Sequence, residues 1–251
     1  MRAIRPLASA AGAALLDLLL PRACVACGGA MDAVDVGVVC GRCWSRTRSL
    51  PFPQCERCGH PTGGRRCRWC ALLPPYVRAV RSVCWVSAGT APAIIHALKY
   101  HGWTAVADGM ATRLARLAWP ADVIAERAAL VPVPLAATRE RERGFNQSAL
   151  LARALAARWR VPAWEDVLER TRTTPTQTRL TPGERAANVH NAFRAAMDAR
   201  SRLRGAHVVL VDDVVTTAAT LNACAAALCA GGARIVSYVT FGRAPALGDS
   251  A

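Results

Sequence analysis

The sequence HVVLVDDVVTTAAT occupies residues 207–220, and this stretch decides the fold. Its apolar part, residues 208–211, has the length and composition of a buried strand and ends in two carboxylates, Asp212 and Asp213. A short hydroxyl-rich turn follows and opens an alanine-rich helix that ends near the glycine pair at 231–232. A strand, a tight turn and a helix in this order indicate one unit of a parallel α/β sheet.

The residues at the end of this strand suit one kind of ligand. At the carboxyl edge of a parallel sheet, the two carboxylates can accept hydrogen bonds from sugar hydroxyls, while the hydroxyl and backbone N–H groups of the turn suit a phosphate. Both halves fit a phosphorylated ribose. A metal site or two solvated carboxylates would explain the acidic pair but not the hydroxyl-rich turn. The chain has no Gly-Lys-Ser/Thr sequence, which disfavours a Walker-type nucleotide site.

The elements around this unit continue the alternation of strand and helix. Apolar runs and amphipathic patterns predict, in chain order, a strand over 80–86, helices over 91–100 and 106–118, a strand over 129–133, a helix over 147–159 and a strand over 166–170. A polar stretch at 171–191 precedes the last strand, helix and strand, which run to about residue 241. This order predicts an α/β fold in which helices flank a parallel sheet.

Cysteine spacing gives the second strong signal. Eight of the eleven cysteines form four C-x-x-C pairs, which are Cys24/Cys27, Cys40/Cys43, Cys55/Cys58 and Cys67/Cys70. Each two-residue spacer lets two thiolates reach one cation, and four cysteines are a usual ligand set for structural zinc. Gly28 and Gly59 follow the second cysteine of two pairs, where the chain must turn sharply. We expect one or two zinc ions that act as a scaffold, bound by consecutive pairs or by interleaved ones.

Other uses of these cysteines are less favoured. A thioredoxin-type redox site is normally a single C-x-x-C at a helix start, and common ferredoxins space their cluster ligands differently. Arg65, Arg66, Arg68 and Trp69 surround the last pair, where they could contact phosphates and bases or form a solvated surface. The three remaining cysteines lie in apolar segments and are interpreted as core residues, namely Cys84, Cys224 and Cys229.

Charge and hydropathy bound the partners and the compartment. The formal net charge of +15 attracts phosphates, nucleic acid or anionic lipid. The apolar stretch at 8–20 contains Asp17 and is shorter than the roughly 20 apolar residues that span a bilayer, so we interpret it as a packed amphipathic helix. No other segment approaches that length. We therefore expect a cytoplasmic protein without an integral membrane segment, with peripheral contact at the inner membrane as an alternative.

The stretch at 207–220 resembles the phosphoribosyl pyrophosphate (PRPP) signature of type I phosphoribosyltransferases. The resemblance implies that Asp212 and Asp213 hold the ribose hydroxyls, directly or through Mg²⁺. It also implies that the loop after them wraps the 5′-phosphate, through Thr216, Thr217, Ala218, Ala219 and Thr220. Members of this family commonly have glycine where this chain has Ala218, so the added methyl is expected to tighten the loop or to weaken binding.

Several motifs together extend the resemblance over almost the whole chain. The four C-x-x-C pairs, LKY at 98–100, VPVP at 131–134, RGFNQ at 143–147 and the acidic pair with its hydroxyl turn are similar to the ComF family. That resemblance implies an amino-terminal double zinc ribbon over residues 1–78, a phosphoribosyltransferase-like domain over 79–245 and a tail over 246–251. Proteins of that family are associated with natural competence and the handling of incoming single-stranded DNA.

The segment from 134 to 147 occupies the place of the diphosphate-binding loop of type I phosphoribosyltransferases. By resemblance, Arg139 and Arg143 neutralise the diphosphate, and Asn146 and Gln147 add neutral donors near a helix start. Arg141 is the weakest candidate in the segment. Because Glu140 and Glu142 alternate with the arginines, a solvated Arg/Glu run is the alternative interpretation.

The polar stretch 173–189 resembles the mobile hood of the glutamine-dependent amidophosphoribosyltransferases. In that position Gln177 and Arg185 would meet the diphosphate while the closed hood excludes water. Lys99 lies near the start of the domain, where it could contact a phosphate or extend along the surface as an ordinary lysine. His96 and His101 are assigned no catalytic role.

Two functions follow. The first is transfer of phosphoribosyl from PRPP to an unidentified acceptor with Mg²⁺ present, in which Asp212, Asp213 and Arg143 take part in catalysis. The second is a non-catalytic zinc-ribbon protein that binds single-stranded DNA and either senses PRPP or uses the fold as a scaffold. Competence-machinery proteins are expected partners in both cases.

Overall fold

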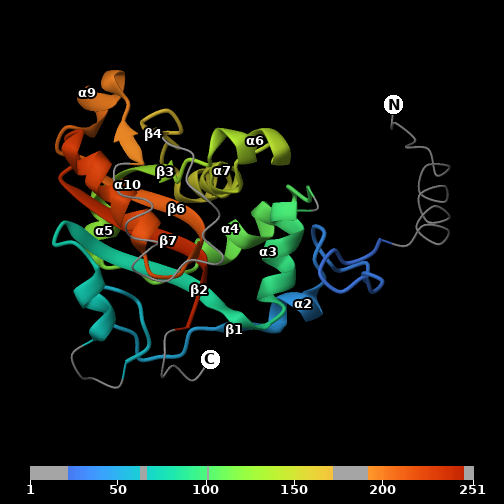
Figure 1. The fold of residues 1–251 in the computed structure, drawn as a ribbon. Coiled ribbons are helices and arrows are strands. Elements are labelled where there is room, and N and C mark those ends of the chain that lie inside the picture. Colours follow the sequence, from blue (N-terminus) through green and yellow to red (C-terminus); the bar gives the residue numbers. More distant parts are fainter. Residues whose placement is uncertain (1–21, 63–66, 101, 172–191, 246–251) are drawn as a thin grey trace, which may run out of the picture.

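A computed structural model describes residues 22–62, 67–100, 102–171 and 192–245. The predicted amino-terminal helix, the tail and the 173–189 stretch lie outside these residues. A five-stranded sheet forms the centre, in the order β1-β2-β7-β6-β3 (Figure 1). Strands β2, β7, β6 and β3 are parallel, and the short β1 pairs antiparallel with β2 at one edge. The bounds are β1 Thr47–Ser49, β2 Val77–Gly89, β3 Arg127–Pro132, β6 His207–Val215 and β7 Ile235–Arg243.

Helices cover both faces of this sheet, as the sequence predicts. One face carries α3 Ala91–Tyr100, α4 Val106–Leu114 and α7 Gln147–Trp159, and the other carries α10 Ala219–Ala230 (Figure 1). A small antiparallel pair, β4 Leu168–Arg170 and β5 Phe193–Ala195, packs beside α10. The remaining short elements are α2 Gly41–Ser45, η1 Arg68–Leu72, α5 Ala121–Glu126, α6 Ala137–Arg143, η3 Met197–Ala199 and α9 Arg200–Leu203.

Most element predictions hold, with differences at particular ends. The helices at 91–100 and 147–159 have the predicted bounds, whereas β2 begins at Val77 and α4 ends at Leu114 rather than at residue 118. The sequence interpretation of 134–147 as a loop was wrong for its centre, because residues 137–143 form α6. This helix buries none of its residues, so it lacks the apolar periodicity by which helices are found in a sequence.

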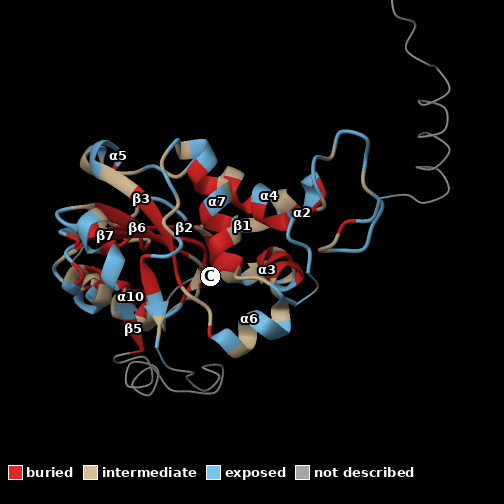
Figure 2. Ribbon diagram, turned by 90° about the horizontal axis from the view of Figure 1, so that it is seen from above, coloured by how far each residue is buried: buried red, intermediate tan, exposed pale blue. Residues whose placement is uncertain are grey.

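Each face of the sheet has its own apolar core, and each core includes cysteines. The central strands are largely red, that is buried, in Figure 2. Cys24, Cys40 and Cys43 pack with the residues of α3, α4 and α7. Cys58 packs on the opposite side with the residues of α10 and β4–β5. The cysteine-rich region is therefore part of both cores. The predicted division of the chain at residue 78 stays a prediction.

Candidate functional site

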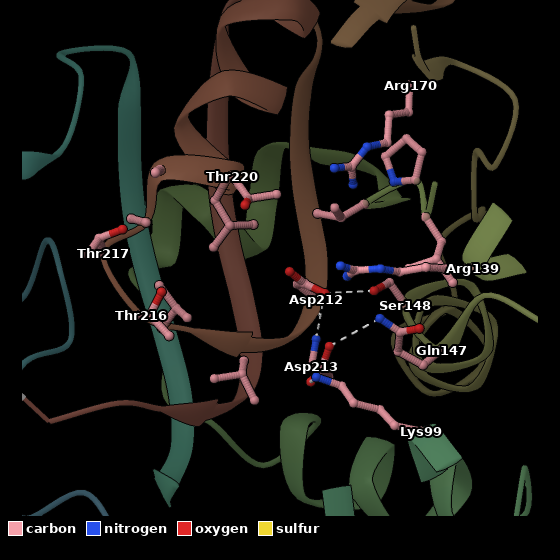
Figure 3. Close-up of a pocket in the computed structure, with 18 residues that line it drawn as sticks. Lys99, Arg139, Gln147, Ser148, Arg170, Asp212, Asp213, Thr216, Thr217 and Thr220 are labelled. Carbon is pink, nitrogen blue, oxygen red and sulfur yellow. Dashed lines mark hydrogen bonds and ion pairs between the residues drawn. The ribbon is translucent and has the colours of Figure 1, made fainter. Parts of the chain in front are cut away.

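A cavity of about 400 Å³ opens at the carboxyl ends of β6 and β3, beside the amino ends of α7 and α10 (Figure 3). This is the sheet edge at which parallel α/β folds bind their ligands. The polar residues that line it are Lys99, Arg139, Gln147, Ser148, Arg170, Asp212, Asp213, Thr216, Thr217 and Thr220. The structure thus brings the predicted sugar-binding carboxylates and the predicted phosphate loop into one cavity.

Asp212 keeps one carboxylate oxygen open to the cavity. Its Oδ1 accepts hydrogen bonds from the Ser148 hydroxyl at 2.8 Å and from the Asp213 N–H at 2.9 Å, and among the described residues none donates to Oδ2. Burial, and after it the charge of Asp213, raise the pKa of Asp212 to about 7. A carboxylate whose Oδ2 accepts no hydrogen bond from the described residues fits a sugar hydroxyl or a hard cation such as Mg²⁺, which prefers oxygen ligands.

Asp213 is held from two sides. Gln147 Nε2 donates to its Oδ1 at 3.2 Å, and Lys99 forms an ion pair with its Oδ2 (Figure 3). Burial works against the charge of Lys99, but the nearby Asp213 carboxylate outweighs it and raises the pKa of Lys99. Lys99 therefore stays protonated and lies in the cavity, rather than along the surface. The charged group that Lys99 contacts is the Asp213 carboxylate.

The predicted phosphate loop connects β6 to α10 through a left-handed residue. Ala218 has φ +61° and ψ +6° and is the residue immediately before α10. A left-handed backbone conformation costs a residue with a Cβ roughly 1–2 kcal/mol. This cost explains why glycine is common at this position in type I phosphoribosyltransferases. The loop residues 216–220 line the cavity beside the amino end of this helix, where backbone N–H groups favour an anion.

Replacing Ala218 by glycine is expected to stabilise the protein. The Ala218→Gly variant relieves the left-handed strain, and the gain, reduced by the greater freedom of glycine in the unfolded chain, is about 1 kcal/mol. Urea denaturation of the zinc-loaded protein measures the change. Ala219→Gly is the matched control, because residue 219 is the first of the helix and glycine there lowers stability. An Ala218→Gly variant less stable than the parent would contradict the strained loop.

Two arginines line the cavity from elements on its other side. Arg139 comes from α6 and Arg170 from the end of β4, and both lie across from Asp212 (Figure 3). Arg139 was predicted from the sequence, whereas Arg170 and Ser148 were missed. Ser148 directly follows the predicted Gln147, and this adjacency is a usable signal. Nothing in the sequence marks Arg170, since only the fold brings β4 to this edge.

Arg143 and Asn146 are not among the residues that line the cavity. The Arg143 guanidinium donates to Gln147 Oε1 and lies 5.4 Å from the centre of the Tyr100 ring. Asn146 caps α7, since its Oδ1 accepts from the Ser148 N–H at 3.0 Å, and its Nδ2 donates to the Val133 carbonyl at 3.0 Å. Both residues thus hold Gln147 and the start of α7. The predicted Gln177 and Arg185 lie outside the described residues.

The eight paired cysteines form two separate clusters. Within each cluster the four sulfur atoms lie within 4.8 Å of one another, and the members are Cys24, Cys27, Cys40 and Cys43 in the first and Cys55, Cys58, Cys67 and Cys70 in the second. Consecutive pairs are therefore combined, which resolves the alternative of interleaved pairing. Gly28 and Gly59 have positive φ angles of 72° and 65°, as expected for the sharp turns. Four thiols at this spacing fit structural zinc.

Comparisons with known proteins bear on both parts of the chain. Residues 15–73 match the family model described as a double zinc ribbon domain, and residues 146–248 match the phosphoribosyl transferase domain. The DNA utilization protein YhgH of Salmonella typhi is 34% identical over 87% of this chain and 96% of its own length. The protein of that name from Escherichia coli K12 is 32% identical over the same shares.

A further relative carries a competence name. Competence protein F of Haemophilus influenzae is 38% identical over 38% of this chain and 41% of its own length. Among the described residues, no helix is both long and apolar enough to cross a membrane. The two family models and the relatives agree with the architecture built above, in which two zinc-binding clusters join a phosphoribosyltransferase-like sheet.

Proposed function

This chain belongs to the ComF family, and from that premise we propose that its cavity binds PRPP with Mg²⁺ and transfers the phosphoribosyl group to an acceptor. The observation that supports this most is the meeting of Asp212 and the 216–220 loop in one cavity of about 400 Å³. A carboxylate for the sugar and a helix-start loop for the phosphate are the two halves that PRPP requires. We place the protein in the cytoplasm, where its work is linked to competence and DNA use.

Different residues of the cavity bind different parts of PRPP. The loop 216–220 binds the 5′-phosphate, and the open oxygen of Asp212 binds the ribose hydroxyls or Mg²⁺. Bound Mg²⁺ would supply positive charge to the diphosphate oxygens. Arg139 and Arg170 bind the diphosphate from the opposite wall, while Lys99 and Gln147 hold Asp213.

The transfer itself is a displacement at ribose C1. A bond forms from a nucleophilic nitrogen of the acceptor to C1, the bond from C1 to the diphosphate oxygen breaks, and the diphosphate leaves with its electron pair. The proton released from the nitrogen passes to water. Arg139 and Arg170 neutralise the charge that develops on this leaving group. Arg143 acts through Gln147, as a positioning residue, rather than on the reacting atoms. Release of diphosphate from PRPP, measured while nitrogen acceptors are varied, tests this step.

The affinity for PRPP and Mg²⁺ is expected to rise with pH. Because the pKa of Asp212 is about 7, the ionised fraction of this carboxylate grows about tenfold between pH 6 and pH 8, and only the ionised form binds a cation or accepts two hydroxyl donors. Calorimetric titration at several pH values measures the slope. Asp212→Asn is the control, because it retains the titration of the ligand's own phosphates but lacks this group. Equal slopes in both proteins would contradict the role of Asp212.

A second candidate function is the binding of single-stranded DNA, alone or together with PRPP. The net charge of +15 and the names of the relatives support it. Binding carried by phosphate contacts weakens steeply as salt rises. Fluorescence anisotropy with a labelled oligonucleotide at increasing salt tests it, and Asp212→Asn should leave it unchanged if the DNA site is separate from the cavity. Competence-machinery proteins are the proposed partners of this activity.

A further inference from the structure

The second cysteine cluster, which comprises Cys55, Cys58, Cys67 and Cys70, is linked to both ends of the phosphate loop through hydrogen bonds of two other side chains. The loop leaves β6 after Val215 and enters α10 at Ala219. One tether from the cluster reaches the strand end and another reaches the first turn of the helix. The two contacts come from different residues and can be tested separately.

The tether on the strand side is Arg243, the last residue of β7. Arg243 is paired in register with Val215, and the next residue along the chain, Ala244, donates its N–H to the Val215 carbonyl at 2.8 Å. Arg243 is buried, with only 1% of the residue exposed. Nη2 donates to the carbonyl of Cys58 at 2.6 Å, and the guanidinium lies 5.3 Å from the centre of the Trp69 ring. Arg243 thus joins the strand end to Cys58 of the cluster and to Trp69, which directly precedes Cys70.

The tether on the helix side is Asn222, in the first turn of α10. Its Nδ2 donates to the carbonyl of Leu72 at 2.8 Å, and Leu72 ends the short helix η1 that contains Cys70. The Tyr238 hydroxyl donates to the Asn222 Oδ1 at 3.0 Å and fixes the orientation of the amide. The Asn222 N–H donates to the Ala218 carbonyl at 2.8 Å. The same residue therefore contacts Ala218, the strained loop position, and Leu72, two residues after Cys70.

The first cluster has different neighbours. Thr90 Oγ1 donates to the carbonyl of Cys43, and Trp44 packs under the Arg113 guanidinium at 3.6 Å and against Phe241 with ring centres 6.2 Å apart. These contacts lead to the start of α3, to α4 and to Phe241 near the end of β7. Within the parts of the chain that the structure describes, no hydrogen bond or ring contact links the first cluster to residues 216–220.

We propose that the second cluster is a brace for the phosphate loop, so that zinc bound there and a phosphoribosyl ligand bound at the loop stabilise one another. Zinc held by the four cysteines would restrain the carbonyls of Cys58 and Leu72. Arg243 and Asn222, which donate to these carbonyls, would then fix the two ends of the loop. By linkage, a ligand that orders the loop must tighten zinc at the second cluster by the same factor. The ligand half of this inference rests on the proposed function, whereas the brace itself does not. Arg243 and Asn222 are positioning residues in it.

Amide hydrogen exchange of the zinc-loaded full chain tests the brace without any ligand. We expect Asn222→Ala and Arg243→Met each to speed exchange of residues 215–222 by about five- to tenfold, the effect of losing one hydrogen bond that holds the loop closed. The amides of β3 should keep their exchange rates.

Thr90→Val is the matched control, because it removes the corresponding contact to Cys43 at the first cluster. Unchanged loop exchange in both variants would overturn the brace. If buried Arg243 cannot be replaced without unfolding, Asn222→Ala decides alone.

Loss of one zinc ligand tests the part played by the metal. Cys67→Ser in the second cluster should speed exchange of the loop more than that of β3, whereas Cys27→Ser in the first should change the loop and β3 alike. A loop-specific effect of equal size in the two variants would overturn the assignment to one cluster. Zinc transfer from the second cluster to a coloured chelator should slow when PRPP and Mg²⁺ are added.

If the loop responds to the variants but calorimetry detects no PRPP binding, the brace stands and the proposed function fails. If PRPP binds equally to the parent and to Asn222→Ala, and loop exchange is also equal, the brace fails and the proposed function stands.

Discussion

Removal of zinc from the full chain is expected to abolish its cooperative thermal unfolding transition, including that of the sheet. Cys24, Cys43 and Cys58 are each at most 2% exposed and belong to the two cores on opposite faces of the sheet. A structural zinc site contributes on the order of 10 kcal/mol to folding, which is comparable with the whole stability of a domain. Loss of both ions should therefore unfold more than the ribbons. Scanning calorimetry with and without a chelator measures this.

The return of the transition when zinc is added back is the control for irreversible damage. A chelated protein that keeps the transition of its sheet, and loses only a small separate one, would show that the ribbons fold independently. That outcome would contradict the shared cores. It would also support the predicted division of the chain near residue 78 as a boundary between two folding units.

The Asp212→Asn variant is expected to bind PRPP and Mg²⁺ about 100-fold more weakly than the parent. An amide carbonyl lacks the charge of a carboxylate and is a weaker ligand for a cation, and the loss of two charge-assisted interactions of about 1.5 kcal/mol each corresponds to about this factor. Calorimetric titration at pH 8 measures the change. Asp198→Asn is the matched control, because Asp198 is an exposed acidic residue outside the cavity. Affinity within threefold of the parent would remove Asp212 from the site.

Folding of Asp212→Asn is not expected to suffer. The pKa of Asp212 is raised to about 7 in the folded protein, so this residue favours folding most when it is protonated and its contribution is lost as pH rises from about 4 through 7. The amide has no charge to bury. At pH 8 the free energy of unfolding of the variant should therefore equal or exceed that of the parent, and weaker binding can then be assigned to the site.

The parts of the molecule that were predictable from the sequence are those with local signals. The run at 208–211, the acidic pair and the alanine-rich helix predicted β6, the site edge and α10. The C-x-x-C spacing predicted the eight metal-binding cysteines, whereas their pairing into two clusters came from the structure. Helix α7 was predictable because its apolar residues recur with helical spacing on one buried side. In each case the residues that carry the pattern are neighbours in the chain.

The parts that were missed depend on contacts between distant segments. Arg170 reaches the cavity only because β4 packs near α10, and Lys99 is fixed by Asp213, more than 100 residues later. Helix α6 has no buried face to give it a periodic pattern. Arg143 has the charge expected for a diphosphate ligand, but its contacts with Gln147 and Tyr100 direct it away from the cavity lining. The tethers Arg243 and Asn222 likewise have no local signature.

A crystal structure of the zinc-loaded chain with PRPP and Mg²⁺ is the most direct measurement of what the cavity binds. We expect the 5′-phosphate at the loop 216–220, the ribose hydroxyls or the Mg²⁺ ion at Asp212, and the diphosphate between Arg139 and Arg170. A phosphate bound elsewhere on the protein, or a cavity that stays free of ligand at saturating PRPP, would contradict the assignment of this cavity to a phosphoribosyl ligand.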